Sequence, residues 1–454
     1  MGATTEDAGG LSAAAYACQL LADLAIAPLR APVCADEHPA VGWARSGLMA
    51  LTGAAEGAPQ LCPVPLTTCA DGALAALASL APAGAFDGLR GAQLLAERAA
   101  IAGHTRQGRI APGGACRLFD TQDGAIALNL TRDDDWSLLP AWLETDVAAD
   151  WEALAAALRS RTMHDLVERG RELGLAIAPV VPPLTRTAPW FEWTVSAPRR
   201  MAAAARRARV LDLSALWAGP LCSHLLQRCG ADVVKLESTR RPDGARRGPP
   251  AFFDLLNAGK RSVALDFATA AGRAQLHALV ARADIVIEAS RPRALRQLGI
   301  DAERLVRERG DLIWVSLTGY GRAEPRAQWI AYGDDAGVAA GLSYLMRATT
   351  GSAMFVGDAI ADPLAGLHAA LAAWSAWRSG AGHLISIALV DVVRHCIGFG
   401  APANLDGWRR RAQHWSALIS QDEPRAPTAR VADGVAPALG ADHAAVFAEW
   451  GLAC

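Results

Sequence analysis

The sequence predicts an α/β protein, with an open, Rossmann-like parallel sheet domain and a second, smaller α+β domain. Short apolar runs at 210–213 and 232–237 flank a helical segment over 221–229, and this order is typical of a βαβ unit. Strand-like and helical segments keep alternating as far as residue 317. A separate hairpin signal, Asp123-Gly124, precedes the apolar run 125–130, which predicts an antiparallel unit outside the parallel sheet.

Composition limits the class of protein. A chain of 454 residues can hold two or three domains. Lys and Arg number 44 against 46 Asp and Glu, a balance that does not favour nucleic acid or a membrane surface as partner. Nine cysteines without a C-x-x-C pair favour neither a metal cluster nor a disulfide framework, and they suit a reducing cytoplasm. We also expect no signal peptide and no membrane span, because the chain lacks a basic segment before an apolar core and an 18-residue apolar run.

Shifts in composition divide the chain. An Ala-rich start is followed by a region with mixed helix and strand signals, then by a Pro-, Thr- and Arg-containing connection, and then by the regular alternation. The expected parts are an N-terminal helical segment (1–84), a small α+β domain (85–185), a linker (186–207), the Rossmann-like domain (208–400) and a C-terminal tail packed on it (401–454).

Two basic loops follow strands of the parallel sheet. Loops at the carboxyl ends of such strands form the ligand crevice of an open α/β sheet. A cluster of cations there indicates an anionic, phosphorylated ligand, although a solvated basic surface is an equal alternative on spacing alone. No G-x-G-x-x-G follows the first strand, and no Walker A sequence occurs. The cations are Arg240, Arg241, Arg246 and Arg247 in the first loop and Lys260 and Arg261 in the second.

The motifs of this half occur in a fixed order. They are Val210-Leu211-Asp212-Leu213, Ala218-Gly219-Pro220, Gly230 to Glu237 and Gly259 to Asp266. Together they resemble the family III CoA-transferases, the carnitine and bile-acid CoA-transferase group that also contains 2-methylacyl-CoA racemases. The resemblance continues through Arg291-Pro292-Arg293, Leu298-Gly299-Ile300 and Thr318-Gly319-Tyr320-Gly321.

Asp362 is the candidate nucleophile. On chemistry alone, an Asp followed by Pro363 at the start of an apolar helix is more often an N-cap. The stretch Asp362-Pro363-Leu364-Ala365-Gly366 matches the D-x-x-[A/T/S]-G of the family, and the resemblance implies that Asp362 attacks the thioester of an acyl-CoA. It then carries CoA as an aspartyl thioester until an acceptor acid takes it. Asp358 is a weaker second candidate.

The resemblance also implies the ligands. Coenzyme A is a substrate rather than a tightly bound cofactor, the partners are an acyl-CoA and a carboxylic acid, and the family forms interlocked homodimers. A glycine-rich loop covers the family's active site, and Gly113-Gly114 is its candidate here. No metal site is expected. The residues expected to bind CoA are Trp217, Ala218, Arg240, Arg241, Lys260, Arg261, Arg291, Arg293, Tyr320 and Gly321.

The order of parts departs from the family. The region that resembles its small domain precedes the βαβ half, and a second small domain is missing after residue 393. Asp71 mirrors Asp362, and 46–49 mirrors 340–342, so we infer a decayed duplication in which the back of one copy is fused to the front of another. Two alternatives stay open. One is an acyl-CoA racemase or isomerase, disfavoured because Tyr332-Gly333-Asp334-Asp335 lacks the racemase His; the other is a non-catalytic CoA-binding relative.

Overall fold

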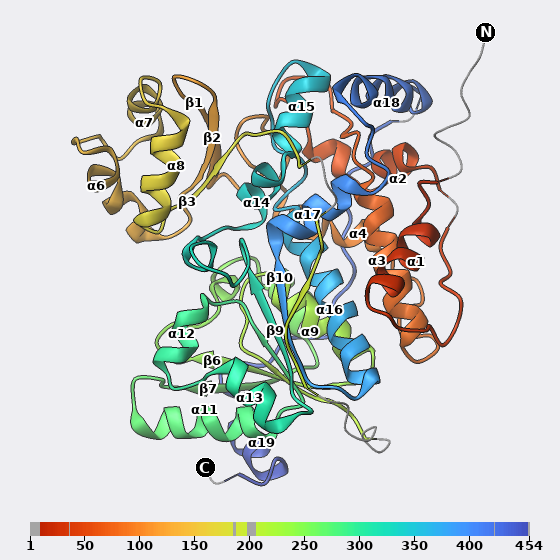
Figure 1. The fold of residues 1–454 in the computed structure, drawn as a ribbon, viewed down its shortest axis with the longest axis vertical. Coiled ribbons are helices and arrows are strands. Elements are labelled where there is room, and N and C mark those ends of the chain that lie inside the picture. Colours follow the sequence, from red (N-terminus) through yellow and green to blue (C-terminus); the bar gives the residue numbers. More distant parts are fainter. Residues whose placement is uncertain (1–9, 36, 185–187, 198–205, 422, 453–454) are drawn as a thin grey trace.

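The large sheet has seven strands and is parallel except at one edge. The computed structural model describes residues 10–35, 37–184, 188–197, 206–421 and 423–452. The strand order is β4-β10-β9-β8-β5-β6-β7, and only the β4–β10 pair is antiparallel among these strands. The predicted mixed α/β fold is therefore confirmed (Figure 1). The strands are β4 (Glu192–Ser196), β5 (Arg209–Asp212), β6 (Asp232–Ser238), β7 (Arg261–Leu265), β8 (Ile285–Glu288), β9 (Ile313–Thr318) and β10 (His383–Ala388).

Alternating side chains of the sheet enter two cores. Val210 and Val233 face the helices α9 (Ala218–Arg228) and α16 (Ala361–Ser379), whereas Leu211 and Val234 face the opposite side, as the two-residue repeat of a strand requires. That opposite side is covered by α11 (Ala270–Arg282), α13 (Ala302–Arg309) and α19 (His443–Glu449). Of the shorter helices, α10 (Pro250–Asn257) follows β6 and α12 (Pro292–Gln297) follows β8.

Two local expectations need correction. Helix α9 begins at Ala218 rather than after Pro220, because the first turn of a helix needs no N–H from a proline. The segment expected to be only a linker contains β4, whose side chains are exposed except at Val195. An edge strand of this kind carries little hydrophobic signal, which is why the sequence did not reveal it.

The small domain has its own sheet and core. Strands β1 (Cys116–Asp120), β2 (Ala125–Asn129) and β3 (Ala176–Pro179) form an antiparallel sheet in that order. The predicted hairpin is confirmed, since Asp120 pairs with Ala125 across the turn. The helices α6 (Leu139–Leu143), α7 (Trp151–Leu158) and α8 (Met163–Glu172) complete this unit, which lies apart from the large sheet in Figure 1.

The N-terminal helices share the core of the large domain. Helix α3 (Leu66–Leu80) is almost wholly buried and packs against both α1 (Ala13–Asp23) and α16. The chain continues through α2 (Pro39–Arg45), α4 (Gly91–Leu94) and α5 (Glu97–Ala102). The pairing of α3 with α16 brings together the two helices that the inferred duplication relates.

The C-terminal region returns across the molecule. After α14 (Gly333–Ala340), α15 (Leu342–Thr350) and α17 (Leu389–Gly398), helix α18 (Leu405–Leu418) lies at the top of Figure 1, and the following chain descends to α19 at the bottom. We call residues 423–442 the C-terminal strap.

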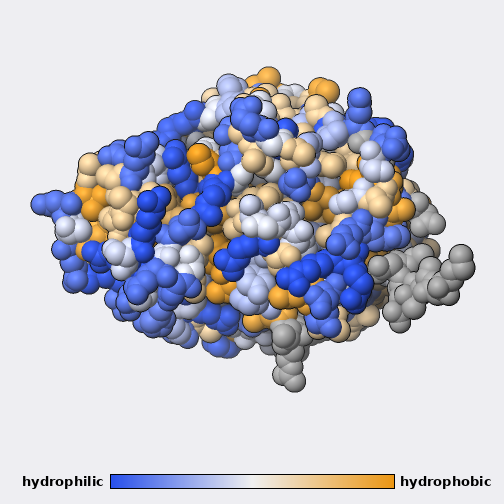
Figure 2. All heavy atoms as spheres, turned by 90° about the horizontal axis from the view of Figure 1, so that it is seen from above, coloured by the Kyte–Doolittle hydropathy of each residue, from blue (hydrophilic) through white to orange (hydrophobic). Residues whose placement is uncertain are grey.

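Within the described ranges, no helix has both the length and the apolar character needed to cross a bilayer. Figure 2 views the molecule from the top of Figure 1. The face seen there is largely hydrophilic, with small apolar areas between the hydrophilic ones.

Candidate active site

A cleft of about 960 Å³ lies where three parts of the chain meet. The small-domain side contributes Gly113, Asn129 and Arg132, the turn after β5 contributes Leu216 and Trp217, and the helix start contributes Asp362. Parts that are distant in sequence therefore form one cavity at the carboxyl ends of the parallel strands, the position expected for a ligand in this class of sheet. Other lining residues are Arg98, His104, Tyr332, Asp334 and the loop 240–249.

Asp362 lies inside the first turn of α16 and is half-buried at the cleft. The N-cap position belongs to Ile360, without a side-chain cap bond, so the interpretation of Asp362 as an N-cap is wrong. The backbone N–H of Gly333 lies near the Asp362 carboxylate and acts to lower its pKa. A Cβ at Gly333 would lie 2.5 Å from Asp362 Oδ2 and would also collide with the carbonyl of Ala359, so this approach requires glycine. The N-terminus of a long helix adds favourable dipole to the carboxylate.

The surroundings of Asp362 place its pKa close to neutral pH. Burial raises its pKa to about 7, the nearby Arg98 guanidinium opposes that rise, and Asp334 and Asp358 add to it. Burial also raises the pKa of Asp334, and the charge of Asp358 adds to that effect. A carboxylate that ionises near neutral pH in a buried cleft is a better nucleophile than a fully solvated one, because less water must be removed before it attacks.

Arg98 is the cation of this cluster. Its Nε lies 2.8 Å from Asp358 Oδ2, and its Nη2 contacts the other oxygen. The guanidinium also lies over Trp217, 5.6 Å from the ring centre. Although burial acts to raise the pKa of Asp358, the charge of Arg98 and the contact with His104 hold it below its usual range. The Nδ1 of His104 is 3.6 Å from Asp358 Oδ2.

Sequence reasoning missed both Arg98 and His104. Arg98 follows Glu97 in the otherwise apolar run 94–102, and two adjacent charges in an apolar helix are a signal of buried ion pairs. His104 had no such signal. The candidate glycine loop does reach the site, since a Cβ on Gly113 would lie 3.3 Å from Arg98 Nη2.

The A-G-P turn and the D-x-x-A-G stretch contact each other. A Cβ on Gly366 would lie 2.7 Å from the carbonyl oxygen of Ala218, so Gly366 lets α9 and α16 approach closely. Trp217 lines the cleft, whereas Ala218 lies behind it in this helix contact. The two motifs thus place Trp217 and Asp362 on one cavity.

The predicted basic residues divide into two groups. Arg240 and Arg241 line the cleft together with Arg246 and Arg247. Arg240 is paired with Asp266 at 3.0 Å and Arg246 with Glu237 at 2.7 Å. Within the described ranges Arg241 and Arg247 show no such ion pair, and both are exposed, so they are the cations most available to a ligand.

The remaining predicted ligands lie elsewhere. Lys260 is enclosed, and its Nζ lies 2.7 Å from Ser223 Oγ and 3.2 Å from Asp212 Oδ2. Arg261 pairs with Asp232 and Glu449. Both act in packing β7, so we remove them from the expected phosphate contacts. Arg291, Arg293, Tyr320 and Gly321 are also absent from the cleft lining; the hydroxyl of Tyr320 lies 3.5 Å from the carbonyl of Ile177 in the buried contact with β3.

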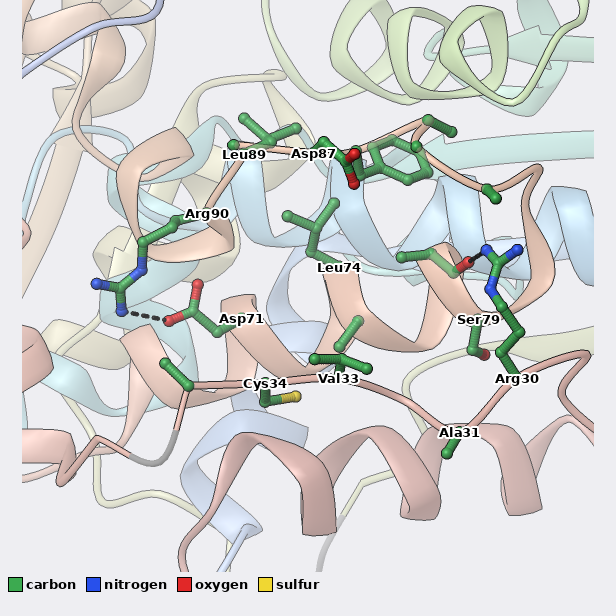
Figure 3. Close-up of a pocket in the computed structure, with 18 of the residues that line it drawn as sticks. Arg30, Ala31, Val33, Cys34, Asp71, Leu74, Ser79, Asp87, Leu89 and Arg90 are labelled. Carbon is green, nitrogen blue, oxygen red and sulfur yellow. Dashed lines mark hydrogen bonds and ion pairs between the residues drawn. The ribbon is translucent and has the colours of Figure 1, made fainter.

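Asp71 faces a separate pocket of about 410 Å³ (Figure 3). Its Oδ2 lies 3.1 Å from Arg90 Nη2, and its Oδ1 accepts a 2.9 Å hydrogen bond from the Ala92 N–H. Leu74 and Val33 line the same pocket. The mirrored aspartate is therefore held in an ion pair, away from Trp217 and the basic loop.

No metal cluster accompanies these carboxylates in the part of the chain that the structure describes. The donors to the buried oxygens are instead Arg98 and backbone N–H groups, including that of Ala359, 2.8 Å from Asp334 Oδ1. The carboxylates of the site can ionise near neutral pH. An ionised carboxylate can act as the nucleophile in acyl transfer through an acid anhydride or a thioester.

Two curated CoA-transferases and one solved structure are similar to part of this chain. The chain is 35% identical over 204 residues to the succinate–glutarate CoA-transferase of Agrobacterium fabrum, which covers 40% of this chain and 50% of the relative. It is 31% identical over 196 residues to the succinyl-CoA–D-citramalate CoA-transferase of Chloroflexus aurantiacus, covering 41% and 49%. The chain thus spans about half the length of these curated relatives. A CAIB/BAIF family protein from Brucella suis aligns at a TM-score of 0.39 and 31% identity, covering 48% of this chain and 58% of that one.

The family comparison covers more of the chain. The profile described as CoA-transferase family III matches residues 207–442, which include β5, the basic loops, Asp362 and the C-terminal strap. Since this match extends over more than half of the sequence, the chain belongs to CoA-transferase family III.

Proposed function

We propose that this protein moves CoA from an acyl-CoA to a free carboxylic acid, with Asp362 as the nucleophile. The observation that carries the proposal is the position of Asp362: a half-buried carboxylate with a pKa of about 7, which lines the same cleft as the exposed cations Arg241 and Arg247. Those cations suit the phosphates of CoA, while the acyl thioester would lie at Asp362.

The proposed exchange has two halves. The Asp362 carboxylate attacks the thioester carbonyl, the C–S bond breaks, and CoA leaves as a thiolate while an aspartyl–acyl anhydride forms. The thiolate attacks the Asp362 carbonyl, which releases the donor acid and leaves an aspartyl-CoA thioester. The acceptor carboxylate then attacks that thioester, and the same steps in reverse give the new acyl-CoA and restore Asp362.

The residues around Asp362 have different roles in the proposed reaction. Arg98 favours the ionised form of Asp362 before each attack, and the nearby backbone N–H of Gly333 acts on its pKa in the same direction. Oxyanions formed at either carbonyl need preorganised donors. Gly113 and its neighbour Gly114, which has φ +83°, lie in the loop that reaches Arg98, so we assign this role to their backbone.

Covalent trapping tests the proposal. Wild type, Asp362→Ala and Asp71→Ala are each mixed with a panel of acyl-CoAs, and intact mass is measured with and without hydroxylamine. We expect a CoA adduct on wild type and Asp71→Ala that hydroxylamine removes, and none on Asp362→Ala. Asp71 is the matched control because it occupies the mirrored helix. CoA binding without adduct or exchange for any donor would favour the non-catalytic relative.

His104 favours a second candidate, an acyl-CoA isomerase. The racemase His is missing from 332–335, but His104 brings an imidazole into the same cleft from another part of the chain. Such an enzyme would exchange the α-proton of a 2-methylacyl-CoA with solvent deuterium. Deuterium uptake without CoA exchange would support the isomerase and exclude the transferase.

The homodimer and the cytoplasmic location stay predictions. The described cleft residues from the small-domain side and from the helix start belong to one chain, so a second copy is not needed to supply either. Light scattering on the active protein would show whether it is a dimer.

A further inference from the structure

The C-terminal strap is anchored beside the cleft by one arginine. Arg430 Nε lies 2.6 Å from Glu97 Oε1, and its Nη2 lies 2.9 Å from Oε2. The Arg430 backbone N–H also donates to Glu97 at 3.1 Å. The Glu97 side chain is fully buried and that of Arg430 is 12% exposed. A bidentate pair with this burial fixes both partners in orientation as well as in distance.

Arg430 also reaches a second helix. Its Nη1 donates to His224 Nε2 at 2.9 Å. Burial, and then the charge of Arg430, hold the pKa of His224 well below its usual value, so His224 is a neutral acceptor at physiological pH. Glu97 is the first residue of α5 and His224 lies in α9, so Arg430 bridges these two helices.

Both helices reach the cleft, α5 through Arg98 and Ala102 and α9 through its N-cap residue. The residue after Glu97 is Arg98, which lies over Trp217, the N-cap of α9. Consecutive residues of α5 thus point to different partners: Glu97 to the strap and Arg98 to Asp358. Any shift of α5 that loosens the first contact must also move the second.

The rest of the strap holds Arg430 in place. Pro427 passes so close to Gly47 that a Cβ there would lie 2.5 Å from the Pro427 Cα. Further along, Ala436 N–H donates to Asp254 at 2.9 Å and Gly440 N–H to Ser262 Oγ at 3.0 Å. The strap therefore connects the N-terminal helices with the large sheet, and Arg430 is its buried contact beside the cleft.

We propose that Arg430 is a positioning residue for the active site: by holding Glu97 and His224 together, it sets α5 so that Arg98 stands against Asp358 and Asp362. The kinetic part rests on the proposed function, whereas the structural part does not. Losing the clamp would displace the guanidinium from Asp362, whose other charged neighbours, Asp334 and Asp358, both disfavour its ionisation.

The test compares Arg430→Ala with Arg425→Ala. Arg425 is an exposed residue of the same strap, and its backbone N–H, which the substitution keeps, donates to the carbonyl of Ala44. For Arg430→Ala we expect kcat to fall about 10- to 100-fold, as misplacement of a catalytic group does, with KM for acyl-CoA changed less than about threefold. The rise of kcat with pH should move to higher pH, and added guanidinium should restore part of the rate.

Hydrogen exchange gives a readout that does not need turnover. Residues 97–102 should exchange faster in Arg430→Ala than in wild type or Arg425→Ala. Unchanged exchange there, or an unchanged pH profile in a variant with faster exchange, would overturn the positioning role. If Arg430→Ala does not fold, Glu97→Gln removes the charge at constant shape and carries the same expectations for kcat, the pH profile and hydrogen exchange, without the rescue by guanidinium. If the wild type does not exchange CoA between acids, the proposed function is contradicted. The hydrogen-exchange experiment then still decides whether Arg430 holds α5.

Discussion

Arg98 and Asp358 form a partly buried ion pair, and Asp358 lies four residues before the candidate nucleophile Asp362. The pair leaves Asp358 charged and places a cation beside Asp362. Because Arg98 comes from α5 and Asp358 from the loop before α16, the pair joins the two inferred copies at the centre of the site. Its two members have separable effects on stability and on catalysis.

We expect Arg98→Met to lose both stability and activity. The uncompensated Asp358 carboxylate should lower the free energy of unfolding by about 3–5 kcal/mol, and activity at pH 7 should fall at least about 10-fold because the pKa of Asp362 rises further. Chemical denaturation and a pH–rate profile measure these effects. Arg98→Met/Asp358→Asn is the matched control: stability should recover while activity stays low. Recovery of both would contradict an electrostatic role for Arg98.

The wild-type pH profile should rise through neutrality. Asp362 must be ionised to attack, and its pKa is about 7, so kcat/KM should increase up to about pH 8 and then level. The CoA-binding affinity should change less over this range, because Arg241 and Arg247 stay charged and the CoA group that titrates there is its phosphate monoester, at about pH 6. A limb centred near pH 4 would show that Asp362 is not in the buried setting described.

The free energy of unfolding should change with pH in the opposite direction to the activity: it should fall as Asp362 ionises. Its folded pKa of about 7 lies above the ordinary 3.8, so the folded state binds the proton more tightly, and this contribution is lost as pH rises from about 4 to about 7. Asp362→Asn should therefore stabilise the protein at pH 8, by on the order of 1–4 kcal/mol, with little effect at pH 4. Asp71→Asn, which removes a carboxylate held by Arg90, should not show this pattern.

Arg241 and Arg247 should affect the KM only of substrates that carry the phosphates of CoA. Arg241→Ala or Arg247→Ala should raise KM for acyl-CoA by about 10-fold, with a smaller effect at high salt, because each removes an exposed charge from the cleft mouth. KM for a pantetheine thioester, which lacks the nucleotide phosphates, should not change. Arg261→Ala is the control, since Arg261 is already paired outside the cleft. An equal effect on both substrates would remove the phosphate assignment.

The sheet and the place of Asp362 at the start of a helix were predictable because their signals are local. Apolar runs and the Asp123-Gly124 turn depend on near neighbours, and the A-G-P and D-x-x-A-G motifs encode one close helix contact, between Ala218 and Gly366. Arg98 and His104 were not predictable in this way, because they reach Asp358 only through the packing of α5. The same limit explains Lys260: its place in a basic turn suggested a ligand, but burial beside Asp212 makes it structural.

Gly333 offers the sharpest test of the geometry at Asp362. A methyl group in Gly333→Ala would overlap the Ala359 carbonyl and would lie 2.5 Å from Asp362 Oδ2, so the carboxylate must move from its present position. We expect adduct formation to fall about 100-fold, with the fold retained by circular dichroism. Gly248→Ala is the control, because Gly248 also lines the cleft but has room for a Cβ, 3.4 Å from the nearest atom. Since Gly333 contributes only backbone, full activity in Gly333→Ala would mean that Asp362 does not react from this position.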